Sequence, residues 1–343
     1  MQRFVSRILM GLFLLGFVMY LIPEPQKSSA QNQIQNEKQQ PKKEIPILSN
    51  IAPLPKDLKI MEDIEYRRGG SCTWKLDLVM PRERGETPRP AIIFVHGGGW
   101  SSGDKARGIF RSGPVEYAKL GYVCISVNYR LSDEEPFPAC LQDVKCAVRW
   151  LRAHADRYNV DPNRIGGYGN SAGAHLVSLL GLVDENQKLE GDGPWQDQSS
   201  LLNAVCVSAI PTDFVNWPGG IRNQRTVFKL LNSKDTGLEE LAIQASPISY
   251  VSKNAPPFLV FQGAGDRIVD VSQADSFVAA LKAAGAGDIT YQRYPNANHD
   301  VFTRYYRETY PEMEAFFDRV LMNPPAKAKP SGGAYRKAVT AAS

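Results

Sequence analysis

The chain of 343 residues contains few of the side chains that usually bind metals, with five cysteines and four histidines. The cysteines are Cys72, Cys124, Cys140, Cys146 and Cys206. They show no C-x-x-C or similar spacing, so we expect neither a metal nor another cofactor. Because their number is odd, at least one is unpaired within the chain. Cys124 and Cys206 lie in apolar, strand-like runs, which is typical of small core residues.

The body of the chain also lacks an excess of charge of one sign. The formal net charge is +4, but residues 1–58 contribute +3 and residues 324–343 contribute +4, which leaves −3 between them. The two ends of the chain therefore account for its positive net charge. The body gives no electrostatic reason to expect a nucleic-acid partner.

No apolar run reaches the roughly twenty residues that a membrane-spanning helix needs. The run Ile8–Ile22 follows Arg3 and Arg7 and precedes the small residues Ser28–Ala30. A basic start, a short apolar middle and small residues predict a secretory signal peptide over residues 1–30. We therefore expect export to the periplasm or the cell exterior, with membrane attachment only if the segment stays uncleaved.

Short apolar runs alternate with helical patterns over residues 59–323, where we predict one folded domain. Residues 31–58 and 324–343 have too few apolar residues for a core and predict a polar linker and a disordered basic tail. The helical patterns lie around Val115–Leu120, Ala139–Tyr158, Ala172–Leu182 and Ser272–Ala284. This alternation predicts an α/β fold with a mostly parallel central sheet and helices on both faces. Ligands of such sheets bind at the carboxyl ends of strands.

The stretch "RIGGYGNSAGAHL" holds a G-x-S-x-G motif whose serine is Ser171. A strand-like run ends in the motif and a helical pattern starts from it. A serine on that tight turn is held above the sheet at a helix N-terminus, so we predict Ser171 as a nucleophile. The alternative, a glycine-rich turn that happens to contain a serine, leaves the other motifs unexplained.

A serine hydroxyl is a weak nucleophile near neutral pH and needs a base. His299 lies in a late polar loop after a strand-like run, and we predict it as that base. His96 adjoins the glycine run and is expected to order it. His154 is expected to be solvated on a helix, and His175 to support the turn from one helical turn after Ser171.

The base needs a carboxylate to orient it, and both Asp266 and Asp270 follow the apolar run "FLVFQG". Asp270 lies near the start of the next helical pattern, a position typical of a helix cap, so we favour Asp266. The order Ser171, Asp266, His299 is the nucleophile–acid–base order of the α/β-hydrolase fold.

Three consecutive glycines, Gly97–Gly99, follow the strand-like run "AIIFVH". Backbone amides free of side chains can stabilise the oxyanion of a tetrahedral intermediate, by about 3–4 kcal/mol for a key donor. We predict the amides of Gly98 and Gly99 on one side and of Ala172 on the other as an oxyanion hole. Trp100 is the next candidate and is also predicted to contact substrate.

Several motifs, in order, resemble those of α/β-hydrolase carboxylesterases, most closely the acetyl-esterase and feruloyl-esterase-like branch related to the hormone-sensitive-lipase family. They are "HGGGW", "NYRLS", "VDPNRIGGYGNSAGAHL", "AIPTDF", "GAGDRIVDVSQ" and "NANHD". The resemblance covers roughly residues 59–322 and implies a serine esterase that cleaves short acyl esters, of small molecules or polysaccharide, through an acyl-enzyme. Ala209–Ile210 and Ala174 depart from the pattern at positions that shape the pocket.

The polar segment Asp184–Ser200 contains a single tryptophan, Trp195. It is either a rim over the site, with Trp195 contacting substrate, or a solvated loop with Trp195 packed against the body. A polar rim would favour acetyl or other short acyl groups on a sugar alcohol. An amidase, formamidase or peptidase of the same fold is the alternative function. An inactive hydrolase fold used for adhesion is a weaker alternative, because all three triad residues are present.

Overall fold

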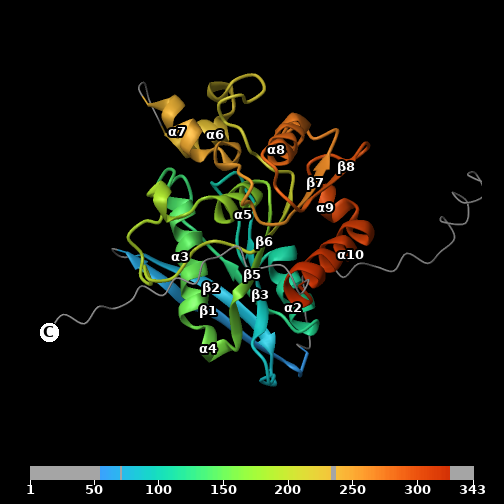
Figure 1. Cartoon of the computed structure of the whole chain (residues 1–343). Helices are drawn as coiled ribbons and strands as arrows, with labels where there is room; N and C mark the ends of the chain where they lie inside the picture. The colour runs from blue at the N-terminus through green and yellow to red at the C-terminus, as the bar shows by residue number, and fades with distance from the viewer. Residues whose placement is uncertain (1–54, 70–71, 233–236, 325–343) are drawn as a thin grey trace, which may run out of the picture. The chain divides into compact units, whose positions relative to one another are not determined.

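The computed structural model describes residues 55–69, 72–232 and 237–324, all in one compact unit of the chain (Figure 1). The predicted signal peptide, most of the predicted linker and nearly all of the predicted tail lie outside the described residues. Within those residues, no helix has both the length and the apolar character to cross a membrane.

An eight-stranded sheet forms the centre of the described part of the chain. The strands are β1 (Leu58–Gly69), β2 (Cys72–Pro81), β3 (Arg89–Val95), β4 (Val123–Val127), β5 (Val160–Asn170), β6 (Ala204–Ser208), β7 (Phe258–Gly263) and β8 (Ile289–Tyr294). Their order across the sheet is β1-β2-β4-β3-β5-β6-β7-β8. β2 pairs antiparallel with both β1 and β4, and all the other pairs are parallel. The predicted mostly parallel sheet is confirmed.

The central strands are apolar throughout because both faces of the sheet are covered. In β3, Ile93 and Val95 belong to one hydrophobic core, and Ile92 and Phe94 belong to a second. Successive side chains of a strand point to opposite faces, so this division follows directly from the strand's period of two.

Helices cover both faces of the sheet, as predicted. They are α2 (Ile109–Lys119), α3 (Ala139–Ala153), α4 (Ala155–Tyr158), α5 (Ala172–Leu182), α6 (Arg225–Leu231), α7 (Leu238–Ala245), α8 (Val271–Ala283), α9 (Val301–Arg304) and α10 (Tyr306–Phe317), with short turns η1 (Glu185–Gln187), η2 (Ile221–Asn223), η3 (Pro247–Tyr250) and η4 (Asp318–Met322). Side chains of α3, α5 and α8 fill the first core, and those of α2, α9 and α10 face the second. Figure 1 shows α3 and α10 on opposite sides of the strands.

The predicted helix Ala139–Tyr158 is divided in two at His154, whose backbone (φ −106°, ψ 17°) leaves the helical region. The predicted helices Ala172–Leu182 and Ser272–Ala284 correspond to α5 and α8, with the second shifted by one residue. Their regular apolar spacing explains why they were predictable.

Cys124, Cys140, Cys146 and Cys206 are buried and free of disulfides. Burial raises the pKa of the Cys124 and Cys206 thiols well above the usual range. Such thiols are unreactive, so both residues act as small apolar core side chains, as predicted.

Two long segments separate elements around β6. Residues 209–257 leave the carboxyl end of β6 and return to the start of β7, and they carry α6 and α7. Residues 184–203 instead join the end of α5 to the start of β6. Because α5 begins at the carboxyl edge of the sheet and runs back along it, this second segment begins at the opposite edge.

Candidate active site

Ser171 lies on the turn between β5 and α5 with a strained backbone (φ 53°, ψ −122°). Such a conformation costs a non-glycine residue about 1–3 kcal/mol and persists only where the surroundings fix it. The N–H of Ser171 donates to the carbonyl of Ser208 at the end of β6, at 2.9 Å. A Cβ on Gly173 would lie 2.0 Å from the Val95 carbonyl oxygen, and one on Gly169 would lie 2.4 Å from the Gly173 carbonyl carbon. Both flanking glycines are therefore required by close backbone packing.

His299 and Asp266 are joined directly, although they are far apart in the sequence. The ring nitrogen Nδ1 of His299 lies 2.9 Å from Oδ2 of Asp266. The other carboxylate oxygen accepts the N–H groups of Ile268 and Val269, at 2.9 and 3.0 Å. The Asp266 side chain is fully buried, and that of His299 is 17% exposed. A carboxylate held in this way keeps the proton of neutral His299 on Nδ1, which leaves Nε2 to accept another proton.

Asp270 serves a different purpose. It is the N-cap of α8, where its carboxylate accepts the N–H of Ser272 at 2.9 Å. The hydrogen bonds from Ser272 lower the pKa of Asp270. The sequence-based preference for Asp266 as the partner of His299 agrees with this geometry.

Ser171 and Asp266 follow strands β5 and β7, which are separated in the sheet by β6. Two strand spacings are about 10 Å. The loop that carries His299 packs directly on the end of β7, since a Cβ on Gly263 would lie 2.4 Å from the Asn298 carbonyl oxygen. The imidazole of His299, bonded to Asp266, thus lies at the edge of the sheet that also carries Ser171.

The glycine loop passes beside the Ser171 turn. A Cβ on Gly97 would lie 3.3 Å from Cβ of Ser171. Gly98 and Gly99 have φ of 117° and 57°, and among the described residues neither of their N–H groups donates a hydrogen bond. Ala172 is the first residue of α5, a position whose N–H has no partner within a helix. These three N–H groups have the chemistry of an oxyanion-binding site.

The BD-FAE family model matches residues 76–281, more than half of the chain. The chain belongs to the BD-FAE family.

Similar proteins are esterases. Esterase LipC of Mycobacterium tuberculosis is 32% identical over 245 residues, which are 65% of this chain and 56% of that protein. A truncated carbohydrate esterase from gut microbiota superposes with a TM-score of 0.66 at 27% identity, covering 76% of this chain and 95% of the other. Est2 of the planctomycete Thermogutta terrifontis, solved with propionate bound, superposes with a TM-score of 0.63 at 25% identity. The match covers 77% of this chain and 93% of Est2.

The α/β-hydrolase fold predicted from the sequence is confirmed by these likenesses together with the sheet order. The chain spans about half the length of the curated relatives that it matches. The family match ends at residue 281, so it includes Ser171 and Asp266 but not His299.

Trp100 of this BD-FAE member does not have the position predicted for a substrate-binding side chain. It is 3% exposed, and its indole N–H donates to Nδ1 of His175 at 3.1 Å. Its ring also meets Phe214 edge-on, with 5.8 Å between the centroids. The indole anchors the glycine loop from below, because the loop's tight turn directs this side chain into the core.

His96 holds the glycine loop in place, as expected, and His175, which was expected to support the Ser171 turn, also contacts this loop through Trp100. His175 is fully buried on α5, and its Nε2 lies 2.6 Å from the Ala245 carbonyl oxygen at the end of α7. Burial lowers its pKa to about 4, so it is neutral near pH 7. The His96 ring stacks on Tyr129 at 4.4 Å, and the Tyr129 hydroxyl donates to the His96 carbonyl at 2.8 Å.

Trp195 lies away from Ser171, contrary to the predicted substrate contact. Its ring meets His154 edge-on at 5.6 Å, and His154 in turn stacks on Trp150 at 4.7 Å. His154 follows the last residue of α3 and precedes β5, so this aromatic group is at the edge of the sheet opposite Ser171. His154 is half-buried there rather than solvated. Trp195 is therefore not part of the site that we propose.

Salt bridges explain the course of the Asp184–Ser200 segment. Glu190 pairs with Lys145 at 2.6 Å and with Arg149, and both partners are buried on α3. Arg152 donates to the Ser199 carbonyl at 2.6 Å. Glu190 thus neutralises two buried charges on α3, while Asp192 pairs with Arg67 of β1 at 2.7 Å.

The segment that does border the site is the one between β6 and β7, which the sequence reading missed. Thr226 at the start of α6 reaches the glycine loop, with its methyl carbon 3.1 Å from where a Cβ on Gly99 would lie. Gln224 Nε2 approaches the Ile268 carbonyl at 3.4 Å, beside Asp266. Four short helical elements and a Pro-Gly turn give this segment little periodicity, so no sequence pattern indicated it.

Gln262 is a second residue that the sequence reading missed. It is fully buried at the end of β7, and its Nε2 donates to Asp266 Oδ2 at 3.2 Å and to the Val269 carbonyl at 3.1 Å. Its Oε1 accepts the N–H of Ile210, at 3.1 Å. Gln262 therefore links the carboxylate to the end of β6. A glutamine within the apolar run "FLVFQG" is the signal that could have indicated it.

Proposed function

We propose that this protein is a serine ester hydrolase that cleaves short acyl esters through an acyl-enzyme. The observation that carries the proposal is the Asp266–His299 hydrogen bond at the sheet edge where the strained turn presents Ser171. The resemblance of the chain to LipC and to a carbohydrate esterase supports ester hydrolysis as the reaction class.

In the proposed reaction, the Ser171 hydroxyl attacks the ester carbonyl carbon while Nε2 of His299 takes its proton. The tetrahedral intermediate then collapses and releases the alcohol, which takes that proton from His299. Water repeats the sequence on the acyl-enzyme: His299 accepts its proton, the acid departs and Ser171 regains a proton. Asp266 stabilises the imidazolium in both halves.

In this proposal, the N–H groups of Gly98, Gly99 and Ala172 receive the negative charge on the carbonyl oxygen. Their orientation is fixed before substrate binds, by the positive φ angles of the loop and by the anchored Trp100. Preorganised donors need no rearrangement during the reaction, which is why they lower the barrier.

We further propose an acetyl or other short acyl group on a carbohydrate alcohol, with a feruloyl ester as a second candidate. The polarity of Asp184–Ser200 no longer supports this substrate, because that segment lies away from the site. The support now comes from the solved neighbours, a carbohydrate esterase and an esterase with bound propionate. Thr226 beside Gly99 also leaves limited room next to the glycine loop.

The test is kcat/KM on p-nitrophenyl esters of increasing acyl length, with acetylated and feruloylated xylan as polymeric substrates. We expect a maximum at short acyl groups and a decline beyond about four to six carbons, because each further methylene gains about 0.8 kcal/mol only where an apolar wall receives it. A maximum at ten carbons or more would identify a lipase. Formamide or peptide turnover without ester turnover would instead favour the amidase or peptidase alternative.

A further inference from the structure

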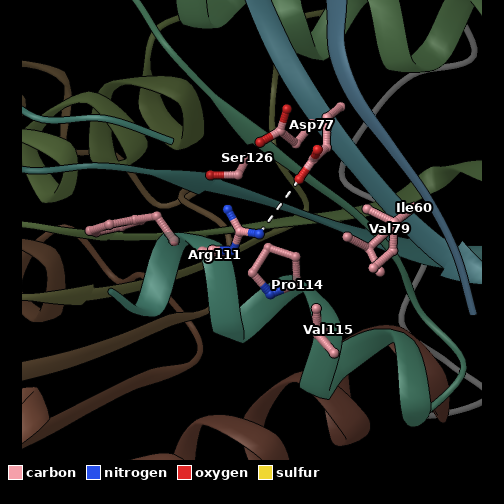
Figure 2. Close-up of a pocket in the computed structure, with 9 residues that line it drawn as sticks. Ile60, Asp77, Val79, Arg111, Pro114, Val115 and Ser126 are labelled. Atoms are coloured by element: carbon pink, nitrogen blue, oxygen red, sulfur yellow. Dashed lines mark ion pairs between the residues drawn. The ribbon is translucent and has the colours of Figure 1, made fainter. Parts of the chain in front are cut away.

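A pocket of about 340 Å³ lies on the outer side of the glycine loop, away from the proposed triad. We call it the Trp74 pocket. Six of its lining residues matter here: Asp63, Trp74, Lys75, Asn128, Tyr129 and Glu134. A second cavity, between α2 and the β1–β2 hairpin, is only about 30 Å³ and is crossed by the Arg111–Glu62 ion pair (Figure 2). That volume suits a single water molecule, so of these two cavities the Trp74 pocket is the one large enough for an organic ligand.

The Trp74 pocket opens at the same edge of the sheet as Ser171. Asn128 directly follows β4, His96 follows β3 and Ser171 follows β5, and these three strands are neighbours. From β4 to β5 is about 10 Å across two strand spacings. His96 and Gly103, at the two ends of the glycine loop, also line the pocket. One loop therefore separates the pocket from the reacting serine.

Buried charges hold the aromatic wall of the pocket rigidly. The guanidinium carbons of Arg67 and Arg130 lie 5.3 and 5.2 Å from the Trp74 ring centroid. Both arginines bond to the fully buried carboxylate of Asp143, at 2.6 and 2.8 Å. The other aromatic ring, Tyr129, is 3% exposed and stacks on His96, so Trp74 is the ring that a ligand can reach. A preorganised aromatic surface loses little conformational entropy when a ligand binds.

The polar groups of the pocket are exposed and adaptable. Lys75 is 45% exposed and reaches Asp63, itself 61% exposed, only at 4.0 Å. Glu134 is also exposed, and it accepts the N–H of Leu131 at 2.7 Å. Asp63 additionally pairs with Lys105 at 3.0 Å, so the acidic charges are partly compensated. The pocket thus offers one cationic donor and several acceptors, without the excess positive charge that an anionic ligand would need.

We propose that the Trp74 pocket binds a neutral pyranose ring of the carbohydrate chain whose ester is hydrolysed at Ser171. A pyranose has apolar ring faces that pack on aromatic rings, and hydroxyls that donate to carboxylates and accept from ammonium groups. This inference rests on the proposed carbohydrate esterase function and adds a second contact, one loop away from the reacting serine.

The test begins with binding, which needs no turnover. Titration of xylohexaose, cellohexaose and mannohexaose into the Ser171→Ala protein should give a measurable Kd for at least one oligosaccharide. Adding Trp74→Ala should weaken that Kd about tenfold or more, and Lys75→Ala should weaken it about threefold. Trp195→Ala is the matched control, since it removes a tryptophan on the opposite edge and should leave Kd unchanged.

Turnover separates this inference from the proposed function. In the Trp74→Ala enzyme, the ratio of kcat/KM on an acetylated oligosaccharide to that on p-nitrophenyl acetate should fall about tenfold. The Lys75→Ala enzyme, whose exposed side chain can be removed without disturbing the core, should show a smaller fall. If the wild type hydrolyses esters but the ratio and Kd do not change, the sugar subsite is wrong. If oligosaccharides bind but no ester is hydrolysed, the proposed esterase function is wrong and the pocket stands.

Discussion

At the scale of single residues, the site depends on side chains that are held in position by an unusual backbone conformation or by buried hydrogen bonds. Ser171 adopts a strained conformation that the packing of Gly173 against Val95 enforces. Asp266 has each of its oxygens occupied by hydrogen bonds. Such groups act as one unit, so variants should show strongly non-additive losses.

Ser171→Ala and His299→Ala should each remove nearly all ester turnover while leaving the fold intact. The double variant should lose little more than either single variant, because nucleophile and base act in the same step. Steady-state rates with p-nitrophenyl acetate, together with circular dichroism of each variant, check this. More than about a tenth of wild-type activity in Ser171→Ala would reject the assignment.

Asp266→Asn and Asp270→Asn should differ sharply although the two residues are four positions apart. Asp266→Asn leaves His299 without a carboxylate and should lower kcat by up to about 10⁴-fold. Asp270→Asn keeps a capping side chain on α8, so kcat should change little. The kcat of the two variants is compared after circular dichroism has shown that both are folded. A larger loss of kcat in Asp270→Asn than in Asp266→Asn would assign the acid role to Asp270.

His175 should make stability depend on pH. Its pKa is about 4 in the folded protein, below the 6.5 of an exposed histidine. The unfolded chain therefore binds the extra proton first, and stability is lost as the pH falls from about 6.5 towards 4. We expect His175 to contribute a loss of about 2 kcal/mol between pH 7.5 and 5.

Urea unfolding gives the free energy of unfolding of the wild type and of His175→Gln at both pH values. The contribution of His175 is the difference between the two proteins in how much this free energy changes with pH. His154→Gln is the control, since His154 is half-exposed at the end of α3. Equal pH effects in the wild type and His175→Gln would show that His175 is not responsible.

At the scale of elements, the Asp184–Ser200 segment is fixed to α3 by buried charge. Lys145 and Arg149 are inaccessible, and Glu190 is the carboxylate that both contact. Glu190→Gln should lower the free energy of unfolding by about 3 kcal/mol or more, because two buried cations lose their partner. The kcat/KM of the folded enzyme should be unchanged, because this segment is away from Ser171.

Thermal and urea unfolding measure the loss. Asp197→Asn, an exposed change in the same segment, should stay within about 0.5 kcal/mol of the wild type. An unchanged stability but altered acyl-chain preference in Glu190→Gln would restore the segment to the rim of the site.

Helices and strands could be predicted where packing imposes a regular apolar spacing on the sequence. The irregular segments between them could not. The spacing of Ala274, Phe277, Val278 and Leu281 gave α8 to within a residue. The polarity of Asp184–Ser200 was read as a rim because charged residues are normally solvated. Nothing local indicates that Glu190 neutralises Lys145, which lies forty-five positions earlier and is buried.

At the scale of the whole molecule, the order of the chemical motifs was sufficient to predict that Asp266 and His299 meet. The ends of parallel strands share one edge, so residues that follow successive strands converge there. The roles of Trp100 and Trp195 were not predictable in this way, because a side chain at a strand edge can point into the core or out of it. The backbone turn at Trp100 (φ 56°) decides that question, and the sequence does not encode it visibly.

The placement of residues 209–257 has a consequence for how enzymes of this architecture diversify. β6 and β7 are adjacent and parallel, so this segment leaves the carboxyl edge of the sheet and returns to the opposite edge, with its ends about one strand length apart. The entropy of closing such a loop rises only with the logarithm of its length. A replacement that kept the contacts of Phe214 with Trp100 and of Ala245 with His175 would alter the wall beside the glycine loop at a small cost in loop entropy, while the residues that follow β5, β7 and β8 keep their places. Chimeras that exchange the rest of the segment but keep these two buried contacts should therefore fold and differ in substrate preference.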